Sequence, residues 1–432
     1  MRPAGTHPLN GSSAVQLGLG VNRGQFFLLV LVNAFVGAMV GVERAVLPVL
    51  AEDAFGVAST TAVLSFLIPF GLAKAGANLL AGDLAHRVGR RRILLAGWLF
   101  GLPVPLLLAW APSWGWVVFA NLLLGINQGL AWSATVIMKI DLVGARQRGL
   151  AMGINEFAGY LAVALAALGA SYLVAAHGPR SGPVWIGGGA AVLGLLLTLL
   201  FVRDTAAHVA HEAALTAKAV EPKPEALPER FRARLWRVSW THRPLFAANQ
   251  AGFVNNLNDG LAWGLLPLFF ASAGRSLREI GWLAALYPAV WGIAQLGTGA
   301  LSDRLGRRPL IAWGMGLQAL GLLVFAATRS FAEWAAGAVI LGLGTAAVYP
   351  TLIAQVSDLV TPADRASTVG VYRLWRDLGY VAGALLAGLV ADLLGYRVSI
   401  LAVALLTAAS GVVAQVYLPT MHSPPAGRQP PG

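Results

Sequence analysis

Twelve long apolar runs constrain the fold of this chain more than any other feature. Each run has roughly 20 residues, about the length that an α-helix needs to cross a hydrocarbon core of about 30 Å. Only 12% of the residues are charged, whereas a soluble domain has about 25%. We therefore expect membrane-spanning helices over residues 25–48, 59–81, 93–111, 115–138, 149–175, 184–202, 245–271, 278–300, 309–328, 332–356, 366–391 and 396–418.

Two short motifs occur twice in the chain at one fixed offset. Residues 82–91 read Gly-Asp-Leu-Ala-His-Arg-Val-Gly-Arg-Arg, and residues 299–308 read Gly-Ala-Leu-Ser-Asp-Arg-Leu-Gly-Arg-Arg, 217 positions later (299 − 82). The sequence Asp-Leu-Val at residues 141–143 recurs at residues 358–360 with the same offset. An internal repeat that lies between apolar runs is typical of transporters built from parallel halves. The expected fold class is an all-α membrane protein with twelve transmembrane helices in two pseudo-symmetric six-helix bundles.

The repeated loop resembles the signature of the major facilitator superfamily, Gly-x-Leu-Ala-Asp-Arg-x-Gly-Arg-Arg/Lys. The resemblance covers residues 25–418, and the second motif, an acid followed after six residues by Arg, is similar to an element of sugar porters in that superfamily. The resemblance implies a cytoplasmic latch between the two halves. A simple topology signal would explain the arginines but neither the glycines nor the repeat. The expected gate residues are Gly82, Asp83, His86, Arg87, Gly89, Arg90, Asp141, Arg148, Gly299, Asp303, Arg304, Gly306, Arg307, Asp358 and Arg365.

The first copy of the loop departs from the family motif at one position. His86 stands where the second copy has Asp303. One interpretation is that Asp83 supplies the acid from the other side of the turn. Another is that His86 forms the pair with a pH dependence, since the unperturbed pKa of His is about 6.5. The third is a neutral, exposed His86.

The distribution of the basic residues predicts the topology. The net charge is +12, yet only five of the 31 Lys and Arg fall in expected outer loops. This asymmetry follows the positive-inside rule, so the basic surplus indicates topology rather than nucleic-acid binding. Both termini are then cytoplasmic. The predicted organisation is an N-terminal tail (1–24), a six-helix bundle (25–202), a cytoplasmic linker (203–244), a second bundle (245–418) and a C-terminal tail (419–432).

The end of the linker combines aromatic and basic residues. Trp236 and Trp240 are four positions apart and are surrounded by arginines, a pattern that favours a short helix at the level of the lipid headgroups. A docking site for another protein is the alternative.

Carboxylates inside the expected spans are candidates for proton coupling. A charged side chain at the centre of a bilayer costs roughly 2.5–3.5 kcal/mol or more unless it faces a cavity or a partner. Glu43, Glu156 and Asp259 have no Lys or Arg three or four positions away in their own span, so a proton could neutralise them. The alternative is a fixed ion pair with a basic residue of another span (Arg44, Lys74, Arg373 or Arg376).

Polar and aromatic residues in spans one, four, seven, ten and eleven are candidates for substrate binding. The family resemblance implies that spans one, four, seven and ten line a central cavity. Trp132 and Tyr349, which are equivalent in the repeat, either wall this cavity or fill the core. Arg373 and Asp377, four positions apart, either bind substrate or neutralise each other. The candidates are Arg44, Asn127, Gln128, Trp132, Asn255, Asn256, Asn258, Tyr349, Arg373, Arg376 and Asp377.

The sequence favours a secondary transporter over an enzyme, because it contains no nucleotide-binding loop, metal cluster or nucleophile constellation. We expect no cofactor and no metal. The basic in-span residues favour an anionic or zwitterionic solute, with coupling to protons. The alternatives are an efflux pump for amphipathic compounds and a non-transporting receptor on the same fold. Antiporters of the superfamily often carry Arg in span four, where Gly125 stands here, which weakens a drug–proton antiporter. A monomer in the cytoplasmic (inner) membrane of a bacterium is expected, with a small solute, protons and lipid as its partners.

Overall fold

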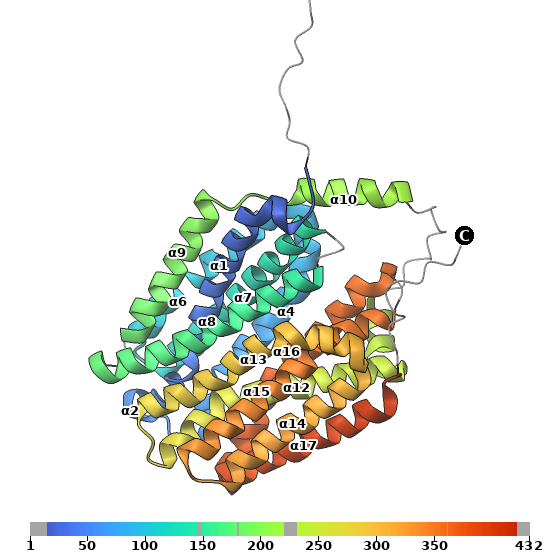
Figure 1. Cartoon of the computed structure of the whole chain (residues 1–432). Coiled ribbons are helices and arrows are strands. Elements are labelled where there is room, and N and C mark those ends of the chain that lie inside the picture. Colours follow the sequence, from blue (N-terminus) through green and yellow to red (C-terminus); the bar gives the residue numbers. More distant parts are fainter. Residues whose placement is uncertain (1–14, 145–147, 179–180, 220–230, 361, 421–432) are drawn as a thin grey trace, which may run out of the picture.

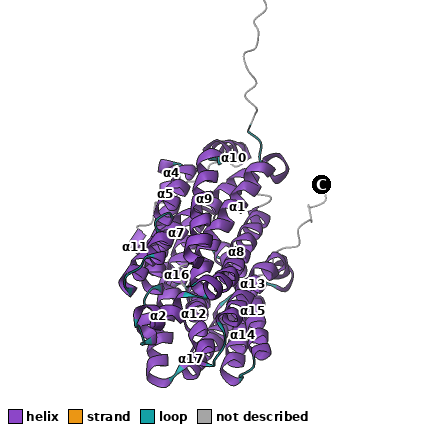
Figure 2. Ribbon diagram, turned by 90° about the vertical axis from the view of Figure 1, so that its left-hand side faces the viewer, coloured by secondary structure: helices purple, strands orange, loops and turns teal. Residues whose placement is uncertain are grey.

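The computed structural model describes residues 15–144, 148–178, 181–219, 231–360 and 362–420, and every regular element in these ranges is a helix (Figures 1 and 2). The first half forms α1 (Leu19–Arg44), α2 (Leu47–Phe55), α3 (Thr60–Leu64), α4 (Leu67–Val88), α5 (Arg90–Gly101), α6 (Val104–Ala109), α7 (Trp114–Val143), α8 (Arg148–His177), the π-helical turn η2 (Pro183–Gly187) and α9 (Gly188–Leu200). The second half forms α12 (Arg243–Ser272), α13 (Leu277–Leu305), α14 (Arg307–Ala327), α15 (Phe331–Asp358), α16 (Pro362–Leu394) and α17 (Tyr396–Tyr417). Between the halves lie α10 (Ala206–Ala219), α11 (Phe231–Trp236) and the π-helical turn η3 (Arg237–Thr241).

Eleven helices within the described ranges are long and apolar enough to cross a membrane, and they match eleven of the expected spans. The remaining span corresponds to α12, which has 30 residues. Its apolar sequence is interrupted by four Asn and one Asp, which lowers its hydropathy. The expected all-α fold is confirmed.

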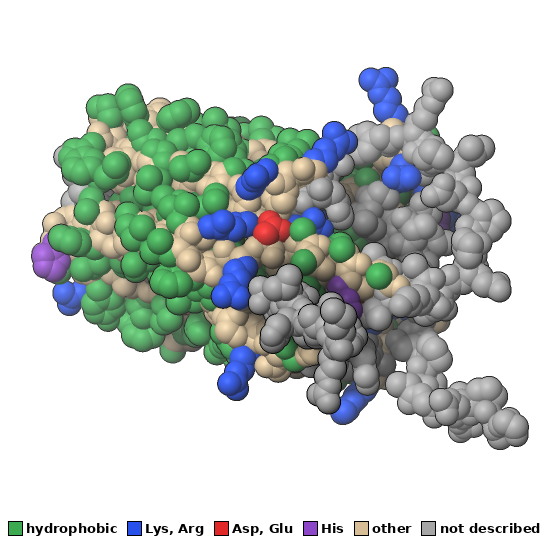
Figure 3. Space-filling view, turned by 90° about the horizontal axis from the view of Figure 1, so that it is seen from above, with side chains coloured by type: hydrophobic (Ala, Val, Ile, Leu, Met, Phe, Trp, Pro, Cys, Tyr) green, Lys and Arg blue, Asp and Glu red, His purple; other side chains and the backbone are tan. Residues whose placement is uncertain are grey.

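Helix α1 starts and helix α17 ends on the same side of the molecule, which we call the terminal face (Figure 1). We call the other side the opposite face. Helix α10 lies across the terminal face (Figure 1). The space-filling view shows hydrophobic side chains over the left-hand part of one side, and Lys and Arg gather where this belt ends (Figure 3). Large apolar side chains such as Trp313 and Leu393 are 75% and 79% exposed, as expected for a surface that lipid covers.

Small residues allow the helices within each half to approach closely. Gly37 and Gly41 of α1 contact the backbone of α8 and leave no room for a β-carbon. In the second half, Gly379 and Gly383 of α16 contact the backbone of α12 in the same manner. Close backbone contact is a main source of helix association in a bilayer, where lipid tails remove most of the hydrophobic driving force.

The two halves meet along two antiparallel helix pairs. Helices α3 and α4 pack against α16, and we call this contact the polar seam because Lys74, Asn78, Asp377 and Asp392 cross it with ion pairs or hydrogen bonds. Helix α8 packs against α13 along the aromatic seam, where Tyr160 stacks on Trp291 and Tyr172 contacts Trp282. The ring centroids of Tyr160 and Trp291 are 3.6 Å apart.

Candidate functional site

A cavity lies between the halves near the middle of the two seams. Helices α4, α7 and α8 of the first half line it together with α15 and α16 of the second. The lining residues are Lys74, Asn78, Gln128, Trp132, Ser133, Val136, Glu156, Tyr160, Tyr349, Arg373 and Arg376. Six of the predicted residues therefore meet at one cavity: Gln128, Trp132, Glu156, Tyr349, Arg373 and Arg376. Lys74, Asn78, Ser133, Val136 and Tyr160 complete the lining. Of these, Ser133 belongs to the polar face of span four that we expected at the substrate site, and the other four were not predicted as binding residues.

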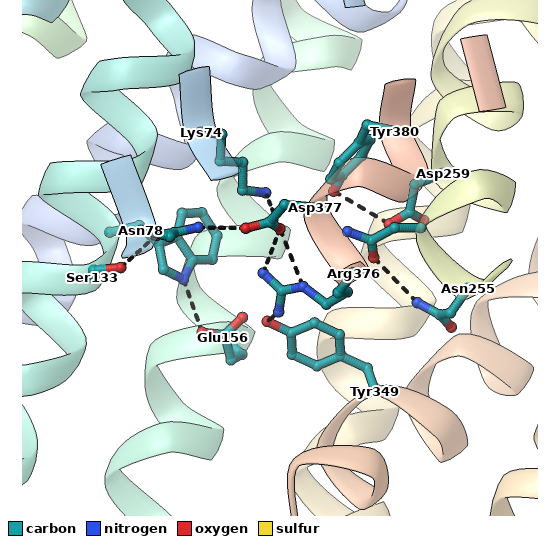
Figure 4. A network of polar contacts seen from close by, with 12 residues as sticks. Lys74, Asn78, Ser133, Glu156, Asn255, Asp259, Tyr349, Arg376, Asp377 and Tyr380 are labelled. Atoms are coloured by element: carbon teal, nitrogen blue, oxygen red, sulfur yellow. Dashed lines mark hydrogen bonds and ion pairs between the residues drawn. The ribbon is translucent and has the colours of Figure 1, made fainter. Parts of the chain in front are cut away.

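Asp377 is the centre of a polar network at the edge of this cavity (Figure 4). It is fully buried, and Arg376 donates to its Oδ1 from Nη2 at 2.8 Å and from Nε at 3.2 Å. From the other half, the Asn78 amide donates to Oδ2 at 2.6 Å, and Lys74 Nζ lies 3.7 Å from Oδ1. Two cations thus share one carboxylate, so the cluster has a net charge of +1.

Arg376 is held in place by a second partner as well. Its Nη1 donates to the hydroxyl of Tyr349 at 2.7 Å, and its guanidinium carbon lies 5.0 Å from the centre of the same ring. The nearby Arg373 differs, because its buried Nε has no hydrogen-bond partner among the described residues. The proposed neutralisation of Arg373 by Asp377 is not formed in this structure: the recorded partners of Asp377 are Arg376, Lys74 and Asn78.

Glu156 lies in the cavity wall on the first half (Figure 4). Its Oε1 accepts hydrogen bonds from the Trp132 indole at 2.9 Å and from the Asn155 amide at 2.8 Å. Its Oε2 is buried without a hydrogen-bond partner in the described part of the chain. A proton on Oε2 would therefore leave both bonds to Oε1 in place.

A buried polar network behind Glu156 was missed by the sequence interpretation. Lys139 is fully buried and donates to the carbonyl of Leu29 at 3.2 Å. Asn33 donates to the Asn155 carbonyl at 3.0 Å and accepts from Thr135 at 3.0 Å. Lys139 directly follows the expected end of span four, so its charge was assigned to topology. Its position one turn after Thr135 on α7 is the signal that could have revealed it.

Asp259 is fully buried but is not among the lining residues of the cavity. It accepts hydrogen bonds from the hydroxyls of Tyr287 and Tyr380, the latter at 3.3 Å. Tyr287 in turn lies 3.1 Å from the Thr345 hydroxyl. The partners of Asp259 in the described structure are thus neutral hydroxyl groups instead of the basic residue expected for a fixed ion pair.

Glu43 and Arg44 are buried nearer the opposite face and also lie outside the cavity lining. The guanidinium carbon of Arg44 is 4.5 Å from the ring centre of Phe70 and 5.3 Å from that of Trp263, which belongs to the second half. None of the Arg44 nitrogens and neither Glu43 oxygen has a hydrogen-bond partner among the described residues. Aromatic faces are therefore the contacts that stabilise this cation.

Four predicted asparagines pack inside their own half instead of lining the cavity. Asn127 donates to the Gly97 carbonyl at 2.8 Å. Asn258 donates to Gln318 at 2.8 Å and accepts from Thr407 at 2.8 Å. Asn255 accepts from Gln318 at 3.0 Å and donates to Asn256 at 3.5 Å. Their polarity joins helices of the same bundle.

The two repeated loops form equivalent ion pairs on the terminal face. Arg90 Nε lies 3.3 Å from Asp141 Oδ2, and Arg307 Nε lies 3.3 Å from Asp358 Oδ2. Each arginine follows a glycine with positive φ, Gly89 at 96° and Gly306 at 89°, a conformation that favours glycine. Asp141 also accepts from the Thr205 hydroxyl at 2.6 Å.

Several predicted gate residues cannot be assigned contacts. The side chains of Asp83, His86, Arg148, Asp303 and Arg365, and the positions Gly82 and Gly299, lie outside the described residues, so the three interpretations of His86 stay open. Arg87 and Arg304 are exposed.

The end of the linker is seated against the helix that carries Arg376 and Asp377. Trp236 and Trp240 are 64% and 51% exposed. The ring of Trp240 contacts that of Trp375 at 5.1 Å, and the Trp375 indole donates to Ser239 at 2.8 Å. The predicted short helix is present as α11 followed by η3, and its membrane contact stays a prediction.

A helical membrane protein of two packed bundles with a charged cavity between them has the architecture of a secondary transporter. This chain belongs to the Major Facilitator Superfamily: the model of that family matches residues 26–250 and 250–431. It is a multi-pass membrane transporter, and proteins of this family bind small-molecule substrates. The resemblance noted in the repeated loops is thereby confirmed.

The relatives described below share less than a third of their residues with this chain. An uncharacterized MFS-type transporter of Pseudomonas aeruginosa (strain UCBPP-PA14) is 28% identical, in an alignment that spans 90% of this chain and 92% of the relative. The multidrug resistance protein MdtG of Proteus mirabilis is 24% identical over 73% of this chain and 75% of its own length. A POT family transporter solved in complex with 5-aminolevulinic acid superposes with a TM-score of 0.71 at 13% identity, covering 91% of this chain and 96% of that one. This last likeness concerns the fold alone.

Proposed function

We propose that this transporter couples proton movement to the transport of an anionic or zwitterionic organic solute by alternating access, and leaves the solute chemically unchanged. The protein would act as a monomer in the cytoplasmic membrane of a bacterium. The terminal face would be cytoplasmic, because most of the Lys and Arg fall in the tails and loops that the sequence places on the same side as the two termini.

The balance of charge in the cavity carries the proposal about the solute. Among the described lining residues, Lys74, Arg373 and Arg376 stand against one carboxylate, Glu156, while Asp377 neutralises only one cation of the Lys74–Arg376 pair. Arg373 Nε has no hydrogen-bond partner among the residues that the structure describes. A carboxylate or phosphate of the solute would supply that acceptor, and a charge-assisted bond of this type is stronger than a neutral one.

The geometry of Glu156 supports its role in proton coupling. One of its oxygens is oriented by two N–H donors, and the other is buried and has no hydrogen-bond partner in the described ranges. Protonation at Oε2 would therefore remove the charge without moving the side chain. A carboxylate that is neutral in one step and charged in another can link the proton to an anion or an ammonium group in the same cavity. Asp259 and Glu43 remain candidates and rank below Glu156, because neither of them lines the cavity.

The test is transport into vesicles under an imposed pH gradient. A thermal-shift screen of carboxylic acids, amino acids and phosphorylated metabolites first selects a ligand, since a ligand that binds the folded state raises the unfolding temperature. We expect Glu156→Gln to abolish accumulation driven by the pH gradient and to retain exchange of labelled for unlabelled solute. Asp259→Asn is the matched variant of a carboxylate outside the cavity. Gradient-driven accumulation that survives in Glu156→Gln would rule out Glu156 as the coupling residue.

A second function, efflux of amphipathic compounds, is favoured by the aromatic lining of the cavity. Trp132, Tyr160 and Tyr349 contribute rings to it, and one relative is named a multidrug resistance protein. Against this function, Gly125 has no room for the Arg of the antiporter motif, because a β-carbon there would collide with the backbone of Phe70. Arg373→Gln separates the two functions: it should weaken transport of an anion and leave that of a neutral amphipathic dye unchanged. Arg376→Gln is a less clean test, because it would also remove a partner of Asp377.

A further inference from the structure

The opposite face is closed at the polar seam by one carboxylate. Asp392, near the end of α16, accepts hydrogen bonds from the backbone N–H of Thr60 at 2.7 Å and of Thr61 at 2.9 Å. The Ser59 hydroxyl donates to the same carboxylate at 2.8 Å. These three bonds join the second half to the start of α3, which continues through a short turn into α4. One turn earlier on α16, Gly388 is pressed against the Cα of Thr61.

The equivalent segment of the second half is capped differently. Ser276 corresponds to Ser59 in the repeat, and there Glu279 of the same helix accepts hydrogen bonds from the Ser276 backbone N–H at 2.9 Å and from its hydroxyl at 2.8 Å. This is a capping box within one helix. The residue equivalent to Glu279 is Ala62, and the residue equivalent to Asp392 is Ala175. The first half thus lacks its own capping acid and receives one from the other half.

We propose that Asp392 is the latch that holds the opposite face closed during the transport cycle. When the halves separate at that face, Ser59, Thr60 and Thr61 exchange the carboxylate for water, since Ala62 offers no acceptor. Ser276 keeps its cap in both states, because Glu279 moves with it. Opening at the polar seam therefore breaks a cap that has no counterpart at Ser276, and Asp392 positions the halves without contacting the solute. This inference rests on the alternating-access part of the proposed function.

Cysteine labelling tests the latch directly, because the chain contains no cysteine. Ser171 provides the reporter: it is fully buried on the aromatic seam against Gly281 of the other half, away from α3. In the Ser171→Cys background, a membrane-impermeant maleimide applied from the opposite face should react slowly. We expect Asp392→Ala to raise the rate on the order of tenfold, which corresponds to about 1.4 kcal/mol, because water takes over most of what the three bonds provide. Asp392→Asn, which keeps the size of the side chain, should show a smaller rise.

Two control variants separate a latch from a helix cap. Glu279→Ala removes the equivalent acid in the second half and should leave the labelling rate unchanged. Ala62→Glu combined with Asp392→Ala gives the first half its own cap without a link between the halves, and should label as fast as Asp392→Ala. An unchanged rate in both Asp392 variants, or a slow rate restored by Ala62→Glu, overturns the proposal. The labelling requires no solute, so the latch can fail while proton-coupled transport stands. Equally, the latch can hold while the proposed solute or coupling proves wrong.

Discussion

The polar and aromatic seams occupy equivalent places in the repeat but are built from opposite chemistry. Lys74 corresponds to Trp291 and Asp377 to Tyr160, each pair being 217 positions apart (291 − 74 and 377 − 160). The ion pair Lys74–Asp377 on one seam is therefore replaced by the ring stack Trp291–Tyr160 on the other. The two copies of the repeat thus keep the same contact between helices but stabilise it with different side-chain interactions.

This difference indicates which seam responds to the solute and the proton. A stack of two rings changes little with charge, whereas an ion pair shared by two cations weakens when an anion competes for them. The same contrast continues toward the opposite face, where Asp392 bridges the polar seam and the Trp282 indole donates to the Tyr172 hydroxyl at 3.1 Å on the aromatic seam. We therefore expect the groups that respond to the solute and the proton to lie on the polar seam.

The largest effect is expected from breaking the ion pair of the polar seam. Asp377→Asn would leave Lys74 and Arg376 buried without a carboxylate, and removing one partner of a buried ion pair typically costs about 3–5 kcal/mol. Thermal unfolding of the purified protein measures the loss. The double variant Lys74→Met/Asp377→Asn should recover part of it. If the double variant is as unstable as the sum of the single ones, the two residues do not act as a pair.

A smaller loss is expected at the equivalent place on the aromatic seam. Trp291→Ala should cost about 2–3 kcal/mol, below the 3–5 kcal/mol of Trp in a water-soluble core, because lipid removes much of the hydrophobic driving force and mainly packing is lost. The loss should be the same at low and high salt, because the substitution removes no charge. A strong salt dependence of the Trp291→Ala loss would erase the proposed distinction between the seams.

The two terminal ion pairs offer a milder comparison between the halves. The side chains of Arg90 and Asp141 are 6% and 11% exposed, against 13% and 36% for Arg307 and Asp358. Arg90→Gln should therefore cost about 1–3 kcal/mol and Arg307→Gln about 0–1 kcal/mol, since exposed pairs are screened by water and salt. Thermal unfolding of the two variants in one buffer checks the order. Equal losses would show that burial does not distinguish the halves here.

The smallest effect concerns α10, which covers the terminal ion pair of the first half. Burial, and then the charge of His211, lower the pKa of His208 below its ordinary value, and its Nε2 lies 3.3 Å from Asn22 Oδ1. The unfolded chain then binds the proton more readily, so stability should fall as pH drops through about 6.5, the pKa of an unperturbed His. His208→Gln should flatten this dependence in melts between pH 5 and 7.5.

Some residues of the site could be predicted from the sequence, because their type stands out against the residues around them. Glu156, Arg373 and Arg376 were found because a charge inside an apolar run is conspicuous, and Trp132 and Tyr349 because they match at the repeat offset. Lys139 was missed because it directly follows the expected end of span four, where a basic residue has the same signature as a topology signal. Lys74 was expected as a possible ion-pair partner and not as a binding residue. Asn127, Asn255 and Asn258 were candidates on polarity alone. Their partners lie on other helices of the same bundle, and residue type does not reveal that.

By itself, the sequence determined the membrane class, the duplicated halves and the family, because run length, charge asymmetry and a fixed offset are properties of the linear chain. Only the tertiary structure decided which charges meet. Asp377 has Arg373 one helical turn away, yet it pairs with Lys74 and Asn78 from the other half. Asp392 likewise serves a segment more than 300 positions earlier in the chain. Such pairings depend on how α4 and α16 cross, and on the direction of each side chain from its helix, which no local pattern encodes.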